Sequence, residues 1–189
     1  MQIAELLTSE QLHPVKTDRV GGGAEKDVYK VVDGIGHVLA AKLYRTIYED
    51  SHEPVDRATA SVNEFNAYKA FRTTALLPYI PCPVRLLHEN SEPVGLLVEW
   101  KNFTLVRDYN NFAYIPNRHF NGLEQVILSL PDNLAPNEDC VEEKNLAYNK
   151  QGLWFTECAI WHRDIPREAY NNRVRKQFDY LRKNYGTNR

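Results

Sequence analysis

The chain has 189 residues, of which 43% are hydrophobic, 11% aromatic and 25% charged. This length and composition are typical of one globular core and exclude a disordered or fibrous protein. The net charge of −2 gives no general electrostatic reason to expect nucleic acid as a partner. Cys82, Cys140 and Cys158 are widely spaced, which argues against a disulfide framework and favours a reducing compartment such as the cytoplasm. No apolar run approaches the roughly 20 residues that a membrane-spanning helix needs, and the first residues do not form a signal peptide of the usual kind.

The first hundred residues predict an antiparallel sheet with one helix in the middle of the segment. Turn-forming residues at 33–36 and 89–92 separate β-rich runs and therefore predict two hairpins. The polar stretch 45–58 contains a proline and is expected to be a loop. The predicted elements are a helix at 3–12, strands at 28–32 and 38–44, a helix at 61–71, and strands at 84–87 and 94–100.

The rest of the chain is expected to be mostly helical, with one further hairpin. The predicted elements are a helix near 123–130, strands at 145–148 and 153–157, and a final helix from about 166 to 183. Together the two parts predict an α+β fold. Lys and Arg concentrate in the final helix, which is either amphipathic with a solvated basic face or carries a patch for a partner or an anionic surface.

A glycine cluster just before the first predicted strand is the most informative motif of the chain. Gly21, Gly22 and Gly23 precede the β-rich run that begins near Val28. A glycine turn of this kind allows backbone N–H groups to approach a phosphate closely. A glycine cluster taken alone is more often a plain turn, because glycine tolerates positive φ.

These residues resemble the opening motifs of the protein-kinase superfamily. The pattern G-x-G-x-x-G-x-V matches Gly21, Gly23 and Val28 in register, with Lys26 in place of the third glycine. Lys42 then occupies the position of the lysine in V-A-I-K. The resemblance implies that Lys42 contacts the α- and β-phosphates of ATP, whereas a lone strand lysine is an ordinary solvated side chain in most proteins.

A kinase lysine needs an acidic partner on the neighbouring helix. The resemblance implies that this partner is Glu64, which lies 22 residues after Lys42 in the predicted helix 61–71. Phe65 and Tyr68 are expected to pack on the adjacent face of that helix. The alternative interpretation is an exposed helix glutamate.

The end of the last strand of the first half resembles the kinase hinge. Val98 takes the place of the residue that guards the back pocket, and Glu99 follows it. The resemblance implies that this segment contacts adenine through its backbone. A strand in the core of the sheet is an equally good interpretation of the same residues.

The catalytic-loop pattern H-R-D-x-x-x-x-N is present only in part. Asn145 resembles the metal-binding asparagine, but Cys140 lies five residues before it, so that Asp139 becomes the candidate base. Glu157 stands where kinases have the aspartate of D-F-G, and its oxygens can bind Mg²⁺. A literal His162-Arg163-Asp164 occurs too close to the end of the chain for this role, and we expect it in a loop or at the cap of the final helix.

Over about residues 18–160 the chain resembles most the minimal bacterial members of the superfamily, namely compact secreted effector kinases and small kinase-like regulators. The resemblance implies a reduced protein-kinase-like fold. Its N-lobe, 1–100, would hold an antiparallel sheet with one helix and the N-terminal helix, and its trimmed, mostly helical C-lobe would be 101–189. The resemblance implies ATP and Mg²⁺ as cofactors and Ser/Thr-type phosphoryl transfer to a protein. It also implies that the protein acts in the cytoplasm, or in a host cytosol if it is a secreted effector.

Three functions stay open from the sequence. The first is a working minimal kinase, in which Lys42 and Glu64 orient ATP and Asp139 accepts the proton of the substrate hydroxyl. The second is a pseudokinase that binds a partner protein, with or without nucleotide, through some of its tyrosines and tryptophans. The third is an unrelated α+β binding module in which the glycine cluster is only a turn.

Overall fold

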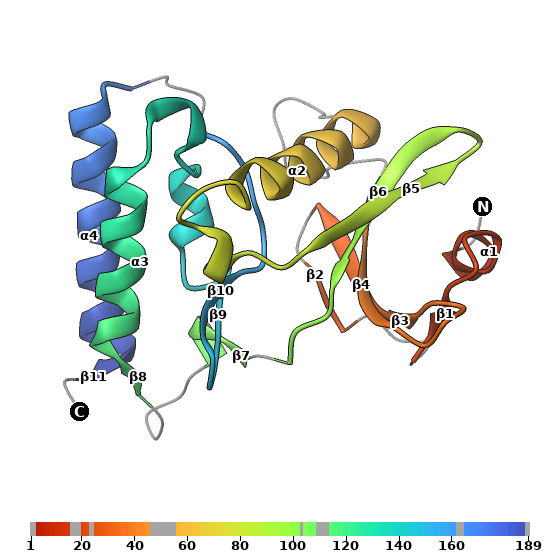
Figure 1. Cartoon of the computed structure of the whole chain (residues 1–189), viewed down its shortest axis with the longest axis horizontal. Helices are drawn as coiled ribbons and strands as arrows, with labels where there is room; N and C mark the ends of the chain where they lie inside the picture. Colours follow the sequence, from red (N-terminus) through yellow and green to blue (C-terminus); the bar gives the residue numbers. More distant parts are fainter. Residues whose placement is uncertain are drawn as a thin grey trace. The chain divides into compact units, whose positions relative to one another are not determined.

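The first part of the chain forms an antiparallel sheet, as its turn signals and β-rich runs predict (Figure 1). The computed structural model describes residues 3–15, 20–22, 25–45, 56–102, 104–108, 114–161 and 165–187. Within these residues the strand order is β1-β3-β4-β6-β5, and β2 also pairs with β3. The strands are β1 (His13–Pro14), β2 (Gly21–Gly22), β3 (Lys26–Val32), β4 (Val38–Tyr44), β5 (Pro83–Glu89) and β6 (Glu92–Glu99). Both predicted hairpins, β3–β4 and β5–β6, are confirmed.

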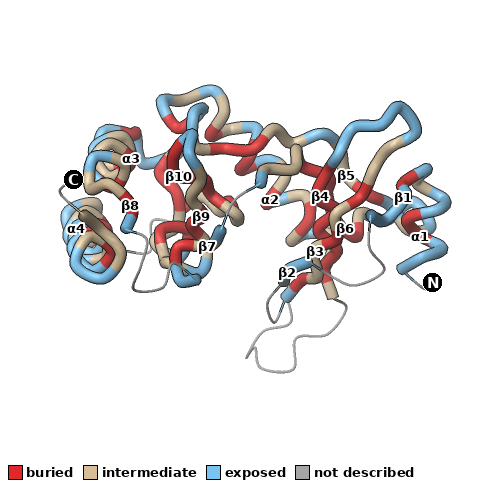
Figure 2. Tube along the Cα trace, turned by 90° about the horizontal axis from the view of Figure 1, so that it is seen from below, coloured by how far each residue is buried: buried red, intermediate tan, exposed pale blue. Residues whose placement is uncertain are grey.

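The two faces of this sheet differ in chemistry because side chains alternate along each strand. Lys26 pairs with Tyr44, and Val28 pairs with Lys42, so these four side chains share one face. The opposite face is apolar and packs against α1 (Ile3–Ser9). That core consists of Leu6, Leu7, Leu12, Tyr29, Val31, Leu39, Ala41, Leu43, Leu87, Val94 and Leu97. Figure 2 shows that β4 and β6 are buried along most of their length.

Gly95 in β6 lies where the backbones of β4 and β6 approach closely. A Cβ atom at this position would lie 2.2 Å from the carbonyl oxygen of Lys42 and 2.9 Å from Cδ2 of Leu43. We therefore expect Gly95→Ala to lower the free energy of unfolding by about 1–3 kcal/mol, the usual cost of overpacking. Gly34→Ala is the matched control, since no atom lies within 4 Å of a Cβ there. Equal urea midpoints for the two variants would contradict the expectation.

The helix α2 (Arg57–Phe71) begins four residues before the predicted start of 61–71. Asp56 provides the cap, because its Oδ2 accepts a hydrogen bond from the backbone N–H of Thr59 at 3.0 Å. The apolar pattern of the helix starts only after this cap, and for this reason the pattern predicted a start of the helix that is too late in the chain. Residues 46–55, most of the predicted loop 45–58, lie outside the described residues.

The buried residues of α2 include a charged one. Glu64, Tyr68 and Phe71 are buried, whereas Val62 and Phe65 are only half-buried. An apolar pattern cannot anticipate a buried glutamate, since carboxylates are almost never fully buried unless they are paired. Tyr68 is thus fully buried and Phe65 half-buried on the face adjacent to Glu64, and the burial of Glu64 itself depends on its ionic partners.

The later part of the chain contains a three-stranded sheet in the order β10-β9-β7. Its strands are β7 (Thr104–Leu105), β9 (Leu146–Asn149) and β10 (Gly152–Phe155). The predicted hairpin is confirmed as β9–β10. Its turn ends at Gly152, whose φ of 138° is rarely adopted by residues with a side chain. The pairing of β7 with β9 had no signal in the sequence because β7 has only two residues.

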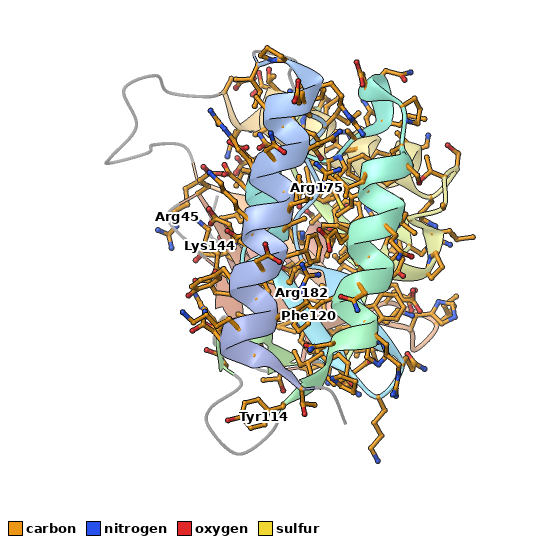
Figure 3. The ribbon with its side chains drawn as sticks, turned by 90° about the vertical axis from the view of Figure 1, so that its left-hand side faces the viewer. Arg45, Tyr114, Phe120, Lys144, Arg175 and Arg182 are labelled. Carbon is orange, nitrogen blue, oxygen red and sulfur yellow. The ribbon has the colours of Figure 1, made fainter. Side chains whose placement is uncertain are left out.

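Two long helices, α3 (Asn117–Ser129) and α4 (Arg167–Tyr185), lie side by side (Figure 3). Helix α3 starts before the predicted 123–130 and buries Phe120, Leu123 and Ile127 at helical spacing. The start of α3 and the end of α4 are joined by the parallel pairing of β8 (Ile115–Pro116) with β11 (Gly186–Thr187). Four short 3₁₀ helices occur in the described residues, η1 (Leu77–Tyr79), η2 (Val106–Asp108), η3 (Asp132–Leu134) and η4 (Glu138–Val141).

Two basic residues of α4 hold the helix in place rather than forming a solvated face. Arg182 donates to Glu124 of α3 at 2.6 Å and to Asp179 at 2.7 Å. Arg167 donates to the carbonyl oxygen of Leu130 at 2.9 Å, and its guanidinium lies 5.0 Å from the ring centroid of Tyr170. The expected basic face was therefore wrong for Arg167 and Arg182.

The chain divides into two compact units. Unit 1 comprises Met1–Asn66 and Cys82–Lys101, and unit 2 comprises Ala67–Pro81 and Asn102–Arg189. The mixed α+β class is confirmed. The lobe boundary at residue 100 stays a prediction. None of the helices in the described part of the chain is long and apolar enough to cross a membrane.

Candidate functional site

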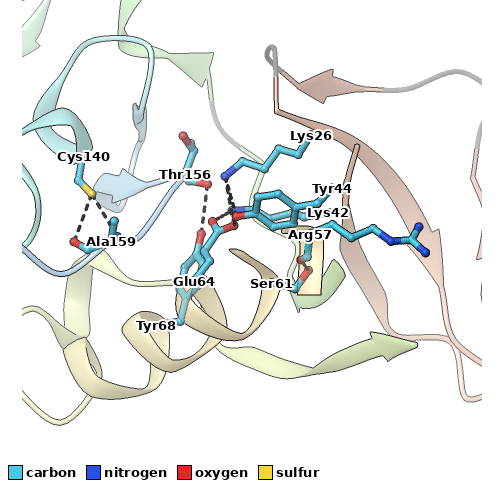
Figure 4. Close-up of polar contacts among 10 residues, drawn as sticks. All are labelled: Lys26, Lys42, Tyr44, Arg57, Ser61, Glu64, Tyr68, Cys140, Thr156 and Ala159. Carbon is cyan, nitrogen blue, oxygen red and sulfur yellow. Dashed lines mark hydrogen bonds and ion pairs between the residues drawn. The ribbon is translucent and has the colours of Figure 1, made fainter. Parts of the chain in front are cut away.

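A buried ion pair in unit 1 joins Lys42 of β4 to Glu64 of α2 (Figure 4). The Lys42 Nζ atom lies 2.6 Å from Oε1 of Glu64, and the two side chains are 5% and 3% exposed. Burying a charge is costly unless it is paired and hydrogen-bonded. The two residues that the kinase resemblance placed together are thus in contact, and the alternatives of a solvated lysine and an exposed glutamate do not describe them.

Lys26 is a second cation on the same carboxylate, and no role was predicted for it from the motifs. Its Nζ atom lies 3.1 Å from Oε2 of Glu64 and 3.5 Å from the hydroxyl of Tyr44, which itself donates to Glu64. Lys26, which stands in place of the third glycine, is the first residue of β3. The predicted strand 28–32 did not include Lys26, whereas the observed strand begins there, so that side-chain alternation places Lys26 and Lys42 on one face.

The pKa of Glu64 reflects these contacts. Burial by itself raises the pKa, but the charges of Lys26 and Lys42 and the hydrogen bonds from Lys42 and Tyr44 lower it from 4.5 to about 2. The carboxylate is therefore ionised throughout the neutral range, and it holds both ammonium groups at fixed positions. A fixed pair of cations is a chemical environment suited to a phosphate anion.

The glycine cluster forms the strand β2 beside β3. Gly21 pairs with Val28, and Gly22 pairs with Asp27, while Gly23 lies outside the described residues. A Cβ atom at Gly21 would meet only Cβ of Val28, at 3.8 Å, which is an ordinary contact. The local fold therefore does not itself require glycine at position 21.

The hinge candidates lie at the end of β6. Val98 pairs with Ala40 and shares the face of Lys42, and it is buried. Glu99 uses its backbone N–H for the carbonyl oxygen of Cys82 at 2.8 Å, and its carboxylate accepts from Lys101 Nζ at 2.6 Å. Val98 thus lies on the charged face of the sheet, and both the N–H and the carboxylate of Glu99 are engaged within unit 1.

The catalytic-loop candidates lie together in unit 2. The side-chain amide of Asn145 donates to the carbonyl oxygen of Asp139 at 2.9 Å, which fixes its orientation. Cys140 is 1% exposed, and its sulfur accepts a hydrogen bond from the N–H of Ala159 at 3.3 Å. The residue that stands five before Asn145 is therefore a packed thiol, whereas Asp139 is exposed.

Glu157 belongs to the same neighbourhood. Thr156, the residue before it, donates its N–H to the carbonyl oxygen of Asn145 at 2.9 Å. Desolvation raises the pKa of Asp139, and the charges of Glu142, Glu138 and Glu157 raise it further, against the opposing effect of Lys144. Among the described residues, no three His, Cys, Asp or Glu side chains converge as a metal site. His162, Arg163 and Asp164 lie outside the described residues.

Comparisons with known proteins identify the fold. No protein-family model matches the chain, and no curated protein matches it. Two crystal structures of Rio2 kinase from Chaetomium thermophilum are similar, both at 16% identity. One, a complex with ADP/Mg²⁺-phosphoaspartate, matches 95% of this chain and 58% of its own with a TM-score of 0.60. The other matches 96% of this chain and 61% of its own with a TM-score of 0.62.

The chain thus has a protein-kinase-like fold, as its motifs predicted. It spans about three fifths of the length of the Rio2 chains that it matches. An unrelated α+β fold, the third alternative from the sequence, does not agree with these matches.

Proposed function

We propose that the chain binds ATP with Mg²⁺ and transfers a phosphoryl group to a protein. The observation that carries the proposal is the buried pair of Lys42 and Glu64, with 2.6 Å between Nζ and Oε1. Phosphoryl transfer depends mainly on positioning and charge neutralisation. A lysine held by a buried carboxylate provides both, because its charge is fixed before the ligand arrives.

The residues of each unit suit a different part of this ligand. In unit 1, Lys42 would bind the phosphates, and Gly21, Gly22, Val28 and Val98 lie on or beside its strand pair. In unit 2, Asn145 and Glu157 offer oxygen ligands of the kind that Mg²⁺ prefers. When bound, the metal ion would neutralise charge on the phosphates. Asp139, with its raised pKa, would accept the proton of the substrate hydroxyl.

Thermal unfolding tests the binding step. A ligand that binds only the folded state stabilises it by about 2.7 kcal/mol at a hundred times its Kd. For a chain of this size that stabilisation raises the melting temperature by roughly 5–10 °C. We expect this rise with ATP and Mg²⁺ and a smaller one with adenosine, which lacks the phosphates. No rise with any nucleotide at millimolar concentration would overturn the proposal while leaving the fold unaffected.

A partner-binding pseudokinase is the second candidate, and the burial of Cys140 favours it. The thiol packs against Ala159 where the kinase pattern has its catalytic aspartate. Binding of ATP without transfer of its γ-phosphate to any protein of a lysate would support this candidate. Transfer that is lost in Asp139→Asn would instead support the kinase. We also propose a cytoplasmic location and a bacterial source, both of which the resemblance to minimal bacterial kinases implies.

A further inference from the structure

Lys26 departs from the glycine pattern, yet its side chain occupies a defined place. It is 9% exposed, and its Nζ atom contacts both Glu64 and Tyr44. The ammonium group also lies 5.2 Å from the centroid of the Tyr44 ring. Burial of a cation is unfavourable unless specific contacts compensate for the lost hydration. Lys26 is therefore held in this position by the fold and does not merely replace a missing glycine.

The strand register brings Lys26 and Lys42 together. Lys26 pairs with Tyr44, and Lys42 pairs with Val28, so the two lysines project from the same face of neighbouring strands. They bind different oxygens of one carboxylate, Lys42 at Oε1 and Lys26 at Oε2 of Glu64 (Figure 4). Two ammonium groups thus converge on a single anchor within unit 1.

We propose that Lys26 is a second phosphate-binding lysine, which acts together with Lys42 on the polyphosphate of the bound nucleotide. The inference rests on the proposed nucleotide-binding function. An ammonium group has three N–H donors, so each lysine can contact Glu64 and still donate to a phosphate oxygen. A polyphosphate carries several negative charges, and two cations match it better than one.

The place of Lys26 in the chain supports this role. It is the first residue of β3 and follows the connection from β2, whose Gly21 and Gly22 pair with β3. Gly22 pairs with Asp27, the neighbour of Lys26, so a phosphate beside the backbone of Gly22 would also lie near the start of β3. Because Glu64 holds both lysines in advance, little conformational freedom would be lost when the anion binds.

Binding of three ligands to the wild-type protein and three variants tests the role of Lys26. The ligands are ADP, inorganic tripolyphosphate and adenosine, each titrated calorimetrically at one fixed Mg²⁺ concentration. We expect Lys26→Met to weaken ADP and tripolyphosphate by about tenfold, the usual effect of losing one charge-assisted hydrogen bond, and to leave adenosine unchanged. Lys26→Arg keeps the charge and should restore most of the affinity. Lys30→Met, on the same face of β3 but beside Trp100, is the control and should bind all three ligands normally.

The outcomes separate this inference from the proposed function. If Lys26→Met binds ADP and tripolyphosphate as tightly as the wild type does, or if its affinity for adenosine falls by the same factor, the role of Lys26 is overturned. The proposed function is not affected by either result. Tripolyphosphate binding that needs Lys26, without any ADP binding, would support the lysine pair and overturn the nucleotide proposal. A wild-type protein that binds neither ligand would overturn both. If Lys26→Met does not fold, Lys26→Gln, which still donates to Glu64 but is uncharged, gives the same comparison.

Discussion

Replacing Glu64 with glutamine is expected to lower the free energy of unfolding by about 3–5 kcal/mol at pH 7, the usual cost of breaking a buried ion pair by removing one partner. Lys26 and Lys42 both bind this carboxylate, and both are buried. The amide of glutamine can accept a hydrogen bond but carries no charge to compensate for two ammonium groups. Urea unfolding of wild type and variant measures the difference. Glu92→Gln is the matched control, because Glu92 is an exposed residue of the same sheet, and it should change stability by less than about 0.5 kcal/mol.

The stability that is lost in Glu64→Gln should depend on pH, and the direction of this dependence follows from the pKa of Glu64. The folded pKa of Glu64 is about 2, below its ordinary value of 4.5. The ionised carboxylate therefore contributes its full stabilisation above about pH 4.5 and loses it as the pH falls toward 2, by roughly 3 kcal/mol in all. Other carboxyl groups with lowered pKa, such as Glu10 beside Arg85, titrate alike in both proteins. The difference between wild type and Glu64→Gln should therefore shrink on acidification, and a constant difference would contradict the assignment.

Replacing Lys42 with methionine is expected to reduce phosphoryl transfer from γ-labelled ATP by about 100-fold or more, a typical effect of removing one group that stabilises developing charge. The fold should tolerate this change better than the loss of Glu64. In the variant, Glu64 keeps its contacts with Lys26 and with the hydroxyl of Tyr44, so no buried charge is left alone. The methionine retains most of the apolar stem of the lysine.

Two measurements separate catalysis from folding in Lys42→Met. Labelled phosphate in the protein fraction reports transfer, and the urea midpoint reports stability. Lys30→Met is the matched control, since its ammonium group lies over the Trp100 ring and not at Glu64. Wild-type transfer rates in Lys42→Met would contradict the proposed role. Normal ADP affinity in the variant would show that Lys42 does not bind the phosphates.

Much of the fold was predictable because local signals agree with the tertiary structure. Asp33 accepts hydrogen bonds from the N–H groups of Ile35 and His37, so the first hairpin turn is stabilised by its own residues. The start of α2 was missed because its cap, Asp56, precedes the apolar pattern by several residues. The packing of Arg167 and Arg182 was missed as well, since their partners are distant in sequence.

The candidate site also contains some residues that could be predicted from the sequence and others that could not. Lys42 and Glu64 were identified from the resemblance to protein kinases, and the structure places them in contact. Asp139, Asn145 and Glu157 were selected from a partial motif and lie near one another, but their chemical roles stay predictions. The burial of Cys140 could not be read from the sequence, because a cysteine in that position is equally compatible with a reactive and a packed thiol.

The hairpins and the presence of the main helices could be predicted from the sequence, because turn residues and apolar patterns act over a few neighbouring positions. The contact of Lys42 with Glu64 was implied by the resemblance to protein kinases. The contact of Lys26 with Glu64, by contrast, became visible only in three dimensions. This contact depends on the register of β3 against β4 and on the approach of α2 to one face of the sheet. In the sequence Lys26 is a departure from the glycine motif, whereas in the structure it is the second cation on a buried carboxylate. The reason is that an ion pair depends on the distance between two groups in space and not on their separation along the chain.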